Sequence, residues 1–145
     1  MDLQEPTRKM STTGGTEQGT VKLLDEPDVI RKKFRSAVTD SGRDVRRAPD
    51  KPGVSNLVDI LAVATGSTPD QVEQDYEGRG YGDLKADVGE AVVELVEPVR
   101  ARYLELRADE TELGRLLAEG ADRARDVAAP TLASMYERMG FVPPG

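Results

Sequence analysis

The sequence predicts a mainly all-α protein in which a polar amino-terminal segment is followed by a helical domain. Apolar residues recur every three or four positions over residues 83–106 and again over 109–139, which is the spacing that lines one face of a helix. The first 20 residues lack this periodicity and contain many Ser, Thr and Gly, a composition typical of loops. The expected division is a loop segment over residues 1–24 and a helical domain over residues 25–145.

The junction between these segments carries a weak strand signal and then a clear helix signal. Residues 20–24 alternate weakly between polar and apolar side chains, which favours a short strand or an extended segment. A lone strand is unstable, so it would be left over from a larger sheet. Two acids before Pro27 are typical of a helix start, and apolar spacing extends this helix to about Thr39. Lys33 lies beside the apolar positions, and its ammonium is expected to reach solvent.

Two shorter helices are expected in the middle of the chain. Ser55 is in position to cap a helix over residues 56–64, and the glycine that follows ends it. Thr68, with Gln71 three residues later, forms the capping-box pattern, and the proline between them favours the first turn of a helix. This second helix is expected to end near Tyr76.

Two long helices are expected in the carboxy-terminal half. The first opens at Asp83 and runs to about Leu106, with a kink at Pro98. Asp109, with Glu112 three residues later, is a capping-box variant that begins the second. Because the link between them is short, an antiparallel helical hairpin is expected. Each apolar stripe is expected to be buried, since a helix gains most of its stability by burying one face.

The composition excludes several kinds of chemistry. The chain has no cysteine and no histidine, so disulfides, thiolate metal sites, cysteine nucleophiles and imidazole acid–base catalysis are all ruled out. No apolar run is long enough to span a membrane, and the first residues carry no signal-peptide pattern. We therefore expect a soluble, cytoplasmic protein.

The segment from Lys9 to Gly15 is the best candidate for a binding site. It contains one cation, three consecutive hydroxyls and two glycines. The lysine supplies a point charge, the hydroxyls donate hydrogen bonds, and the glycines let backbone N–H groups approach a ligand closely, which suits a polyphosphate. The spacing is not that of a Walker loop. On composition alone, a flexible loop without a ligand remains the alternative.

Positive charge is concentrated in one stretch of an otherwise acidic chain. The net charge is −7, yet residues 31–47 hold seven basic residues against two acids, whereas residues 51–98 hold three basic residues against ten acids. Such a strip is either a solvated helix face or a surface that attracts a phosphate-rich partner. Arg43, Arg46 and Arg47 lie on the loop of this strip and are the candidates for such contacts.

Several ordered blocks resemble one known family. Lys9-Met10-Ser11, preceded by Asp2-Leu3-Gln4-Glu5-Pro6, resembles the second signature of class I aminoacyl-tRNA synthetases, usually Lys-Met-Ser-Lys-Ser, and in particular its tryptophanyl branch. The further blocks, which follow in the same order through nearly the whole chain, are Leu23-Leu24-Asp25-Glu26-Pro27, Ala37-Val38-Thr39-Asp40-Ser41, Gly53-Val54-Ser55-Asn56-Leu57, Tyr81-Gly82-Asp83-Leu84-Lys85 and Glu137-Arg138-Met139-Gly140-Phe141.

The resemblance implies a role in the ATP-dependent attachment of tryptophan to tRNA. The loop Lys9, Met10, Ser11, Thr12 and Thr13 would lie over the ATP phosphates, with Mg²⁺ as the expected companion ion and no metal held by protein ligands alone. Lys9, Ser11 and Thr12 would be the catalytic residues. Residues 1–24 would then be the signature loop and the end of a Rossmann-type nucleotide-binding domain, and residues 25–145 the tRNA-anticodon side. The family forms homodimers, and Arg43, Arg46 and Arg47 would contact tRNA.

Two departures from the family pattern bear on activity. The fourth signature position, usually lysine, is Thr12, which brings a hydroxyl but no charge. The first family signature, His-Ile-Gly-His, is not in this sequence, because the chain has no histidine. We therefore expect a carboxy-terminal portion that is inactive without an upstream half. The alternative is a non-catalytic helical module that binds tRNA or a synthetase.

Overall fold

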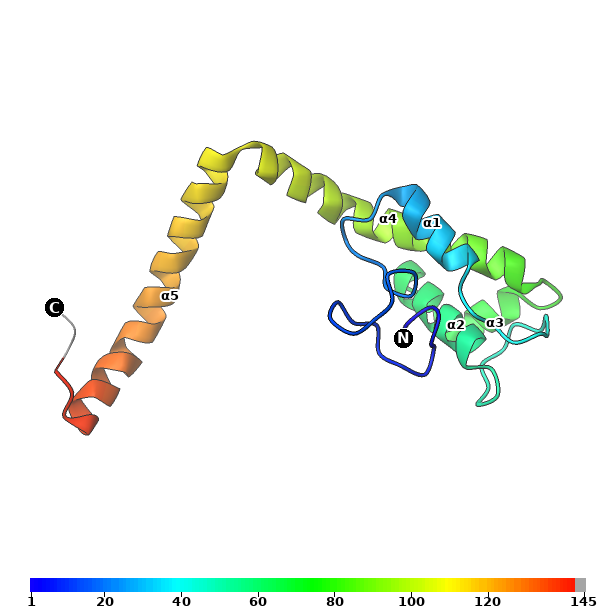
Figure 1. Ribbon diagram of the computed structural model, residues 1–145, viewed down its shortest axis with the longest axis horizontal. Coiled ribbons are helices and arrows are strands. Elements are labelled where there is room, and N and C mark those ends of the chain that lie inside the picture. The colour runs from blue at the N-terminus through cyan, green and yellow to red at the C-terminus, as the bar shows by residue number, and fades with distance from the viewer. Residues whose placement is uncertain (143–145) are drawn as a thin grey trace. The chain divides into compact units, whose positions relative to one another are not determined.

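A computed structural model describes residues 1–142 of the chain, and every regular element in this range is a helix (Figure 1). The helices are α1 (Pro27–Arg35), α2 (Pro52–Thr65), α3 (Pro69–Asp75), α4 (Tyr81–Ala108) and α5 (Glu110–Met139). The predicted all-α class is confirmed. The sequence predicts a short strand or an extended segment over residues 20–24, and the strand is wrong: residues 20–22 have no regular structure, and a turn follows in which Lys22 O accepts the N–H of Asp25 at 3.0 Å.

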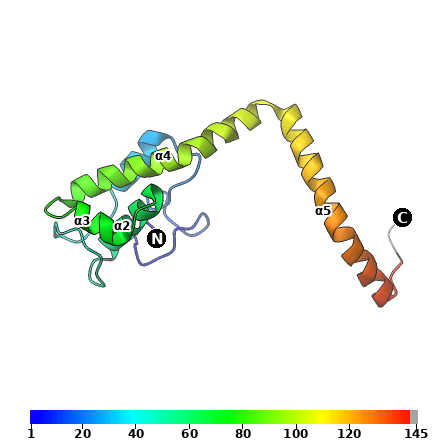
Figure 2. The ribbon, with the colours of Figure 1, turned by 180° about the vertical axis from the view of Figure 1, so that it is seen from behind.

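The chain divides into two compact units, Met1–Arg100 and Ala101–Gly145. In the first unit, helices α1, α2 and α3 gather around the amino-terminal part of α4 (Figure 2). Its core is made of apolar side chains that are almost fully buried, among them Leu3, Phe34, Leu57 and Leu84. Leu3 lies outside the helices, so the amino-terminal loop is packed into the same unit as α1–α4. The functional boundary at residue 24 stays a prediction.

Helix α1 is shorter than its apolar pattern predicts. It begins at Pro27 as expected but ends at Arg35, because the backbone N–H of Val38 donates to Leu3 O at 2.8 Å instead of to the preceding turn. The chain leaving α1 is therefore hydrogen-bonded to the amino-terminal loop.

Helix α2 begins four residues before the predicted start. Pro52 occupies its first turn and Ser55 lies inside the helix rather than at its cap; the Ser55 hydroxyl instead accepts the N–H of Ala48 at 3.2 Å. The early start depends on Gly53, since a Cβ at this position would lie 2.1 Å from the carbonyl oxygen of Val38. The predicted end is confirmed, because Gly66 adopts the left-handed conformation with φ 71°.

Helices α3 and α4 follow their local signals closely. The Thr68 hydroxyl accepts the N–H of Gln71, and the Gln71 side chain accepts the N–H of Thr68, so the predicted capping box is confirmed. Helix α3 gives way at Tyr76, as predicted. Helix α4 starts at Tyr81, two residues before the predicted position, and continues through Pro98 to Ala108.

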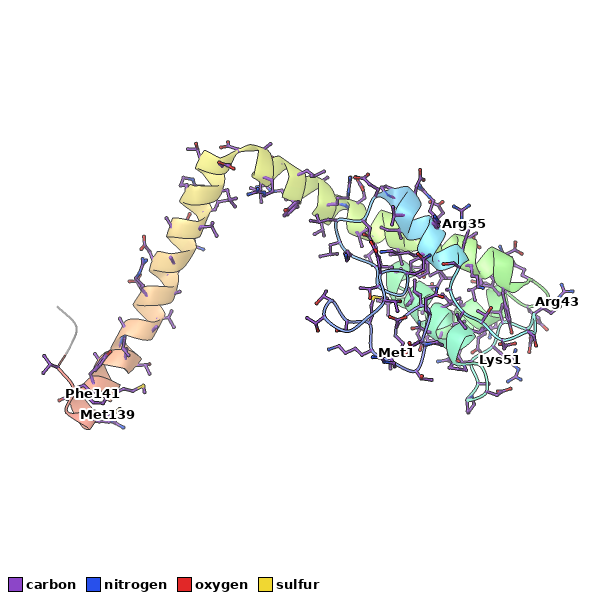
Figure 3. The ribbon with its side chains drawn as sticks, viewed as in Figure 1. Met1, Arg35, Arg43, Lys51, Met139 and Phe141 are labelled. Carbon is purple, nitrogen blue, oxygen red and sulfur yellow. The ribbon has the colours of Figure 1, made fainter. Side chains whose placement is uncertain are left out.

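Helix α5, in the second unit, has the predicted ends but not the predicted burial. Asp109 caps it by accepting the N–H of Glu112 at 2.9 Å, and Gly140 ends it with φ 70°. None of its residues is buried within residues 1–142, so the prediction of a buried α5 stripe is wrong for this chain. Figure 3 shows Met139 at its carboxyl end. Side-by-side packing of the two long helices stays a prediction.

Over residues 1–142, no helix combines the length and the apolar character that crossing a bilayer demands.

Candidate functional site

The candidate nucleotide loop is an exposed turn that is organised around Ser11. The Ser11 hydroxyl accepts the N–H groups of Thr13 and Gly14, each at 3.3 Å. The Ser11 carbonyl accepts the N–H of Gly15 at 3.1 Å. All three contacts join Ser11 to backbone N–H groups two to four residues further on. A serine commonly stabilises a tight turn through local hydrogen bonds of this kind.

Lys9 is available to a ligand at the edge of this turn. Its side chain is exposed, and no hydrogen bond or ion pair engages it within residues 1–142. It lines a small cavity whose other lining residues are Asp2, Glu5, Arg8, Gly14, Gly15 and Thr16. The neighbouring Arg8 is not available in the same way, because its guanidinium pairs with Glu5 at 2.7 Å. Within residues 1–142, the loop thus offers one unpaired ammonium beside two glycines.

Asp2 holds the first turn of the chain and was not singled out from the sequence. Its carboxylate is 3% exposed and accepts the N–H groups of Gln4 and Glu5 at 2.8 and 3.1 Å. Gly19 passes so close that a Cβ there would lie 1.9 Å from Asp2 Oδ1. The bond from the Gln4 N–H to the Asp2 carboxylate, two residues back, makes this an Asx turn, and the known preference of aspartate for such turns is the signal that could have indicated Asp2.

Lys33 is buried, and the prediction that its ammonium reaches solvent is wrong. The Lys33 side chain is 5% exposed, and its Nζ donates to Asp25 Oδ2 at 2.6 Å and to Thr20 O at 2.7 Å. Burial by itself would raise the pKa of Asp25. Hydrogen bonds from the Lys22 N–H and from Lys33 outweigh this effect, so the pKa of Asp25 lies below its ordinary value. A buried lysine is tolerated when it is fully paired.

The three candidate arginines have different environments. Arg47 forms ion pairs with acids of α3, namely Glu73 at 3.0 Å and Asp70. Arg46 pairs with Asp44 at 2.9 Å and is half exposed. Arg43 is exposed, and no ion pair or hydrogen bond holds its side chain within residues 1–142. Of the three, Arg43 is therefore the one whose charge is available to a partner (Figure 3).

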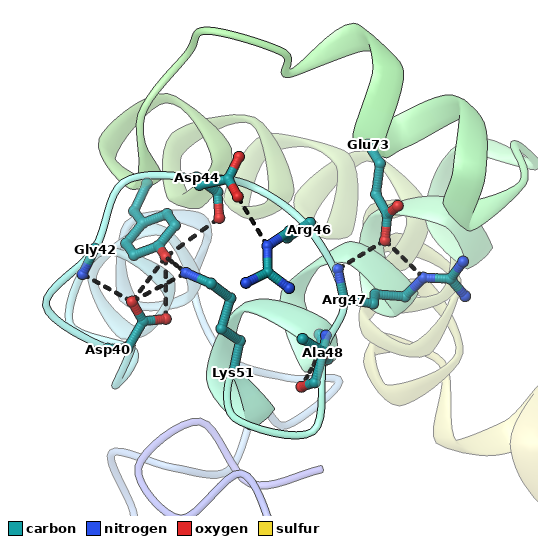
Figure 4. A network of polar contacts seen from close by, with 10 residues as sticks. Asp40, Gly42, Asp44, Arg46, Arg47, Ala48, Lys51 and Glu73 are labelled. Carbon is teal, nitrogen blue, oxygen red and sulfur yellow. Dashed lines mark hydrogen bonds and ion pairs between the residues drawn. The ribbon is translucent and has the colours of Figure 1, made fainter.

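A second polar cluster, which sequence reasoning missed, fixes the loop that carries Arg43. Lys51 Nζ donates to Tyr81 OH at 2.6 Å, and Tyr81 OH donates to Asp40 Oδ1 at 2.9 Å (Figure 4). Burial raises the pKa of Tyr81. Lys51 is 8% exposed. Asp40 and Lys51 lie at the two ends of the loop and Tyr81 is the first residue of α4, so the cluster connects both ends of the loop to α4. Nothing in the local sequence brings these three residues together.

The two predicted sites are separate in the structure. Within residues 1–142, no hydrogen bond or ion pair joins the loop of Lys9 to the loop of Arg43. Nucleotide binding at the first loop and phosphate-backbone binding at the second stay predictions.

The Lys9-Met10-Ser11 loop and the helical unit beside it are together typical of class I aminoacyl-tRNA synthetases. The family model described as "tRNA synthetases class I (W and Y)" matches residues 1–97, and the chain belongs to this family. Within the family, the resemblance is to its tryptophan-specific members. The chain is 52% identical to the tryptophan–tRNA ligase of Mycobacterium leprae over 143 residues and 52% identical to that of Enterococcus faecalis over 142 residues.

The similarity extends to a solved structure. The tryptophanyl-tRNA synthetase of Mycoplasma pneumoniae matches 98% of this chain with a TM-score of 0.85 and 30% sequence identity. The chain spans about 42% of the length of the two ligases and 43% of the solved chain. The prediction of a carboxy-terminal portion of a tryptophanyl-tRNA synthetase is confirmed.

Proposed function

We propose that this chain supplies the nucleotide-loop and helical part of a tryptophan–tRNA ligase, and that residues Lys9–Thr13 bind the phosphates of ATP. The observation that carries the proposal is the ammonium of Lys9, which is exposed and has no ion-pair or hydrogen-bond partner within residues 1–142, in a loop that matches the family signature at Lys9, Met10 and Ser11. The reaction would join tryptophan to ATP, release pyrophosphate and pass tryptophan to tRNA.

The chemistry proposed for the loop is electrostatic. Negative charge develops on the departing pyrophosphate, and a preorganised cation with hydroxyl donors lowers the free energy of that transition state. Lys9 would supply the cation. In the structure the Ser11 oxygen accepts two N–H groups and also lies 3.3 Å from the Thr13 hydroxyl, so the Ser11 hydroxyl hydrogen would turn from Thr13 to a phosphate when ATP binds. Thr12 would donate a hydrogen bond where most family members have a second cation.

ATP would be the substrate, with Mg²⁺ accompanying its phosphates. Residues 1–142 contain no group of three or more acids, histidines or cysteines that could hold a metal ion. The residues that we assign to ATP are donors and a cation rather than metal ligands, and they fit the phosphate oxygens themselves.

We propose a tRNA-contact surface that uses fewer residues than the whole basic strip over residues 31–47. Arg43 is exposed and unpaired within residues 1–142, whereas the charges of Arg46 and Arg47 are shared with acids of the same unit. Contacts to a phosphate backbone require available cations but no particular order of them. Arg43 is therefore the leading candidate, and Arg46 and Arg47 are secondary ones.

Tryptophan-dependent exchange of pyrophosphate into ATP tests the proposal. The 145-residue chain alone is expected to show no exchange. A chimaera in which the amino-terminal portion of the Mycobacterium leprae ligase precedes Met1 is expected to show it. Exchange by the chain alone, or an inactive chimaera beside an active parent ligase, would contradict the proposal. A salt-dependent tRNA titration of the inactive chain would then test the non-catalytic module, because backbone binding weakens steeply with salt.

A further inference from the structure

We propose that Thr20 is a positioning residue for the nucleotide loop and that the buried ammonium of Lys33 holds Thr20 in place. The inference rests on the proposed function, because it concerns how the Lys9–Thr13 loop is presented to ATP. The Thr20 hydroxyl donates to the carbonyl of Ser11 at 3.3 Å. Ser11 is the residue around which the exposed turn is organised.

Thr20 is a fixed point because it is buried and attached to a helix. It is 4% exposed, and its carbonyl accepts Lys33 Nζ at 2.7 Å. Lys33 belongs to α1 and also pairs with Asp25 at 2.6 Å. A continuous set of contacts thus runs from α1 through Thr20 to the backbone of Ser11. Removing one partner of a buried ammonium is strongly destabilising. The contact between Lys33 Nζ and the Thr20 carbonyl is therefore expected to persist in the folded protein.

Gly15 packs closely against both Thr20 and Ser11. A Cβ at Gly15 would lie 2.5 Å from Thr20 Oγ1 and 2.6 Å from Ser11 O. The N–H of Gly15 also donates to the same Ser11 carbonyl at 3.1 Å. Two donors therefore converge on one carbonyl in a closely packed position, while the side chain of Lys9 remains exposed.

We call the hydrogen bond from the Thr20 hydroxyl to the Ser11 carbonyl the anchor. The anchor would act on ATP binding and not on tryptophan binding. Donors and cations that stabilise a reacting phosphate must be held near their productive positions. Without the Thr20 hydroxyl, Ser11 loses one of the two donors on its carbonyl, and the loop adopts its anchored conformation less often. Loss of one neutral hydrogen bond corresponds to a factor of roughly 2 to 10 in such an equilibrium.

Two substitutions in the chimaera test the inference. Thr20→Val keeps the shape and removes the hydroxyl; it is expected to raise the KM for ATP roughly 2- to 10-fold and to leave the KM for tryptophan unchanged. Thr20→Ser keeps the hydroxyl and is expected to behave as the unsubstituted protein. An unchanged KM for ATP, or equal increases in both KM values, would overturn the inference.

Two further measurements separate failure of the anchor from failure of the proposed function. Amide hydrogen exchange in the 145-residue chain is expected to be faster over residues 11–15 in Thr20→Val, with α2 and α3 unchanged; unchanged exchange in the loop overturns the anchor. Lys9→Ala in the chimaera tests the proposed function alone. If Lys9→Ala abolishes activity while Thr20→Val has no effect, only the anchor is wrong; if Lys9→Ala has no effect, the proposed function is wrong.

Discussion

The backbone N–H of Arg47 and its side-chain Nε donate to the same oxygen of Glu73, at 2.7 and 3.0 Å respectively. The backbone donor is the largest cause, followed by the side chain, of a Glu73 pKa below its ordinary value. Arg47 thereby joins the loop after Asp40 to helix α3. A residue that the sequence marks as a candidate for tRNA contact thus also has a structural role.

Arg43→Ala and Arg47→Ala should separate these two roles. Arg43→Ala removes a cation that has no partner within residues 1–142, so tRNA affinity should fall and the salt slope of binding should decrease by about one, with Tm unchanged. Arg47→Ala removes the side-chain contacts to Glu73 and Asp70 of α3 and keeps only the backbone N–H bond to Glu73, so Tm should fall with a smaller change in affinity. Salt titrations of tRNA binding and thermal unfolding measure the two effects. A lower Tm for Arg43→Ala beside an unchanged Tm for Arg47→Ala would contradict this division.

Two glycines near helix starts should respond to alanine with opposite signs. Gly53→Ala forces a Cβ to within 2.1 Å of the Val38 carbonyl, and overpacking of this kind typically costs about 1–3 kcal/mol. Gly82→Ala meets no atom within 4 Å, so it should stabilise by about 0.4–1 kcal/mol through the unfolded state. Urea unfolding of both variants measures the difference. Equal stabilities would show that the approach of Gly53 to Val38 is not as close as described.

The capping box of α3 should make a measurable contribution to stability. Thr68→Ala removes a hydroxyl that accepts the N–H of Gln71, and loss of such a cap costs about 1 kcal/mol. Thr111→Ala is the matched control, because Thr111 is exposed and its hydroxyl makes no hydrogen bond within residues 1–142. Thermal unfolding should show a lower Tm for Thr68→Ala alone. Similar shifts of Tm for both variants would show that loss of the cap does not cause the lower stability.

The Asp25–Lys33 pair should make stability depend on acid pH. Hydrogen bonds place the folded-state pKa of Asp25 below its ordinary value of 3.8. Because the pKa of Asp25 is lowered, the contribution of the pair to the free energy of unfolding is complete above about pH 4, and it is lost as the pH falls through the folded-state pKa. The stability gap between the unsubstituted chain and Asp25→Asn should therefore narrow as the pH is lowered below 4. Urea unfolding at a series of pH values measures this gap; a gap that widens in acid would contradict the pairing.

Local signals in the sequence were sufficient where local contacts determine the structure. The capping box at Thr68, the glycine end of α2 and the cap at Asp109 each involve residues within a few positions of one another, and all three are confirmed. The early start of α2 was not predictable in this way, because it depends on the approach of Gly53 to Val38, fifteen positions away.

The same distinction applies to the candidate site. The Lys9-Met10-Ser11 motif could be read directly from the sequence. The burial of Lys33 could not, because it depends on partners at Thr20 and Asp25 that only the folded chain brings together. The exposed stripe of α5 was misjudged for a related reason: apolar spacing predicts that a helix face is to be covered, but it does not say that this chain contains the surface that covers it.

The rate of pyrophosphate exchange in the Lys9→Ala chimaera tests the central claim most directly. The matched control is Lys32→Ala, which removes from α1 an exposed lysine that has no ion pair or hydrogen bond to its side chain in the described part of the chain, residues 1–142. If Lys9 stabilises charge on the departing pyrophosphate, kcat should fall about 100- to 1000-fold in Lys9→Ala and stay near the unsubstituted value in Lys32→Ala. A Lys9→Ala chimaera that exchanges pyrophosphate as fast as the Lys32→Ala control would contradict the account.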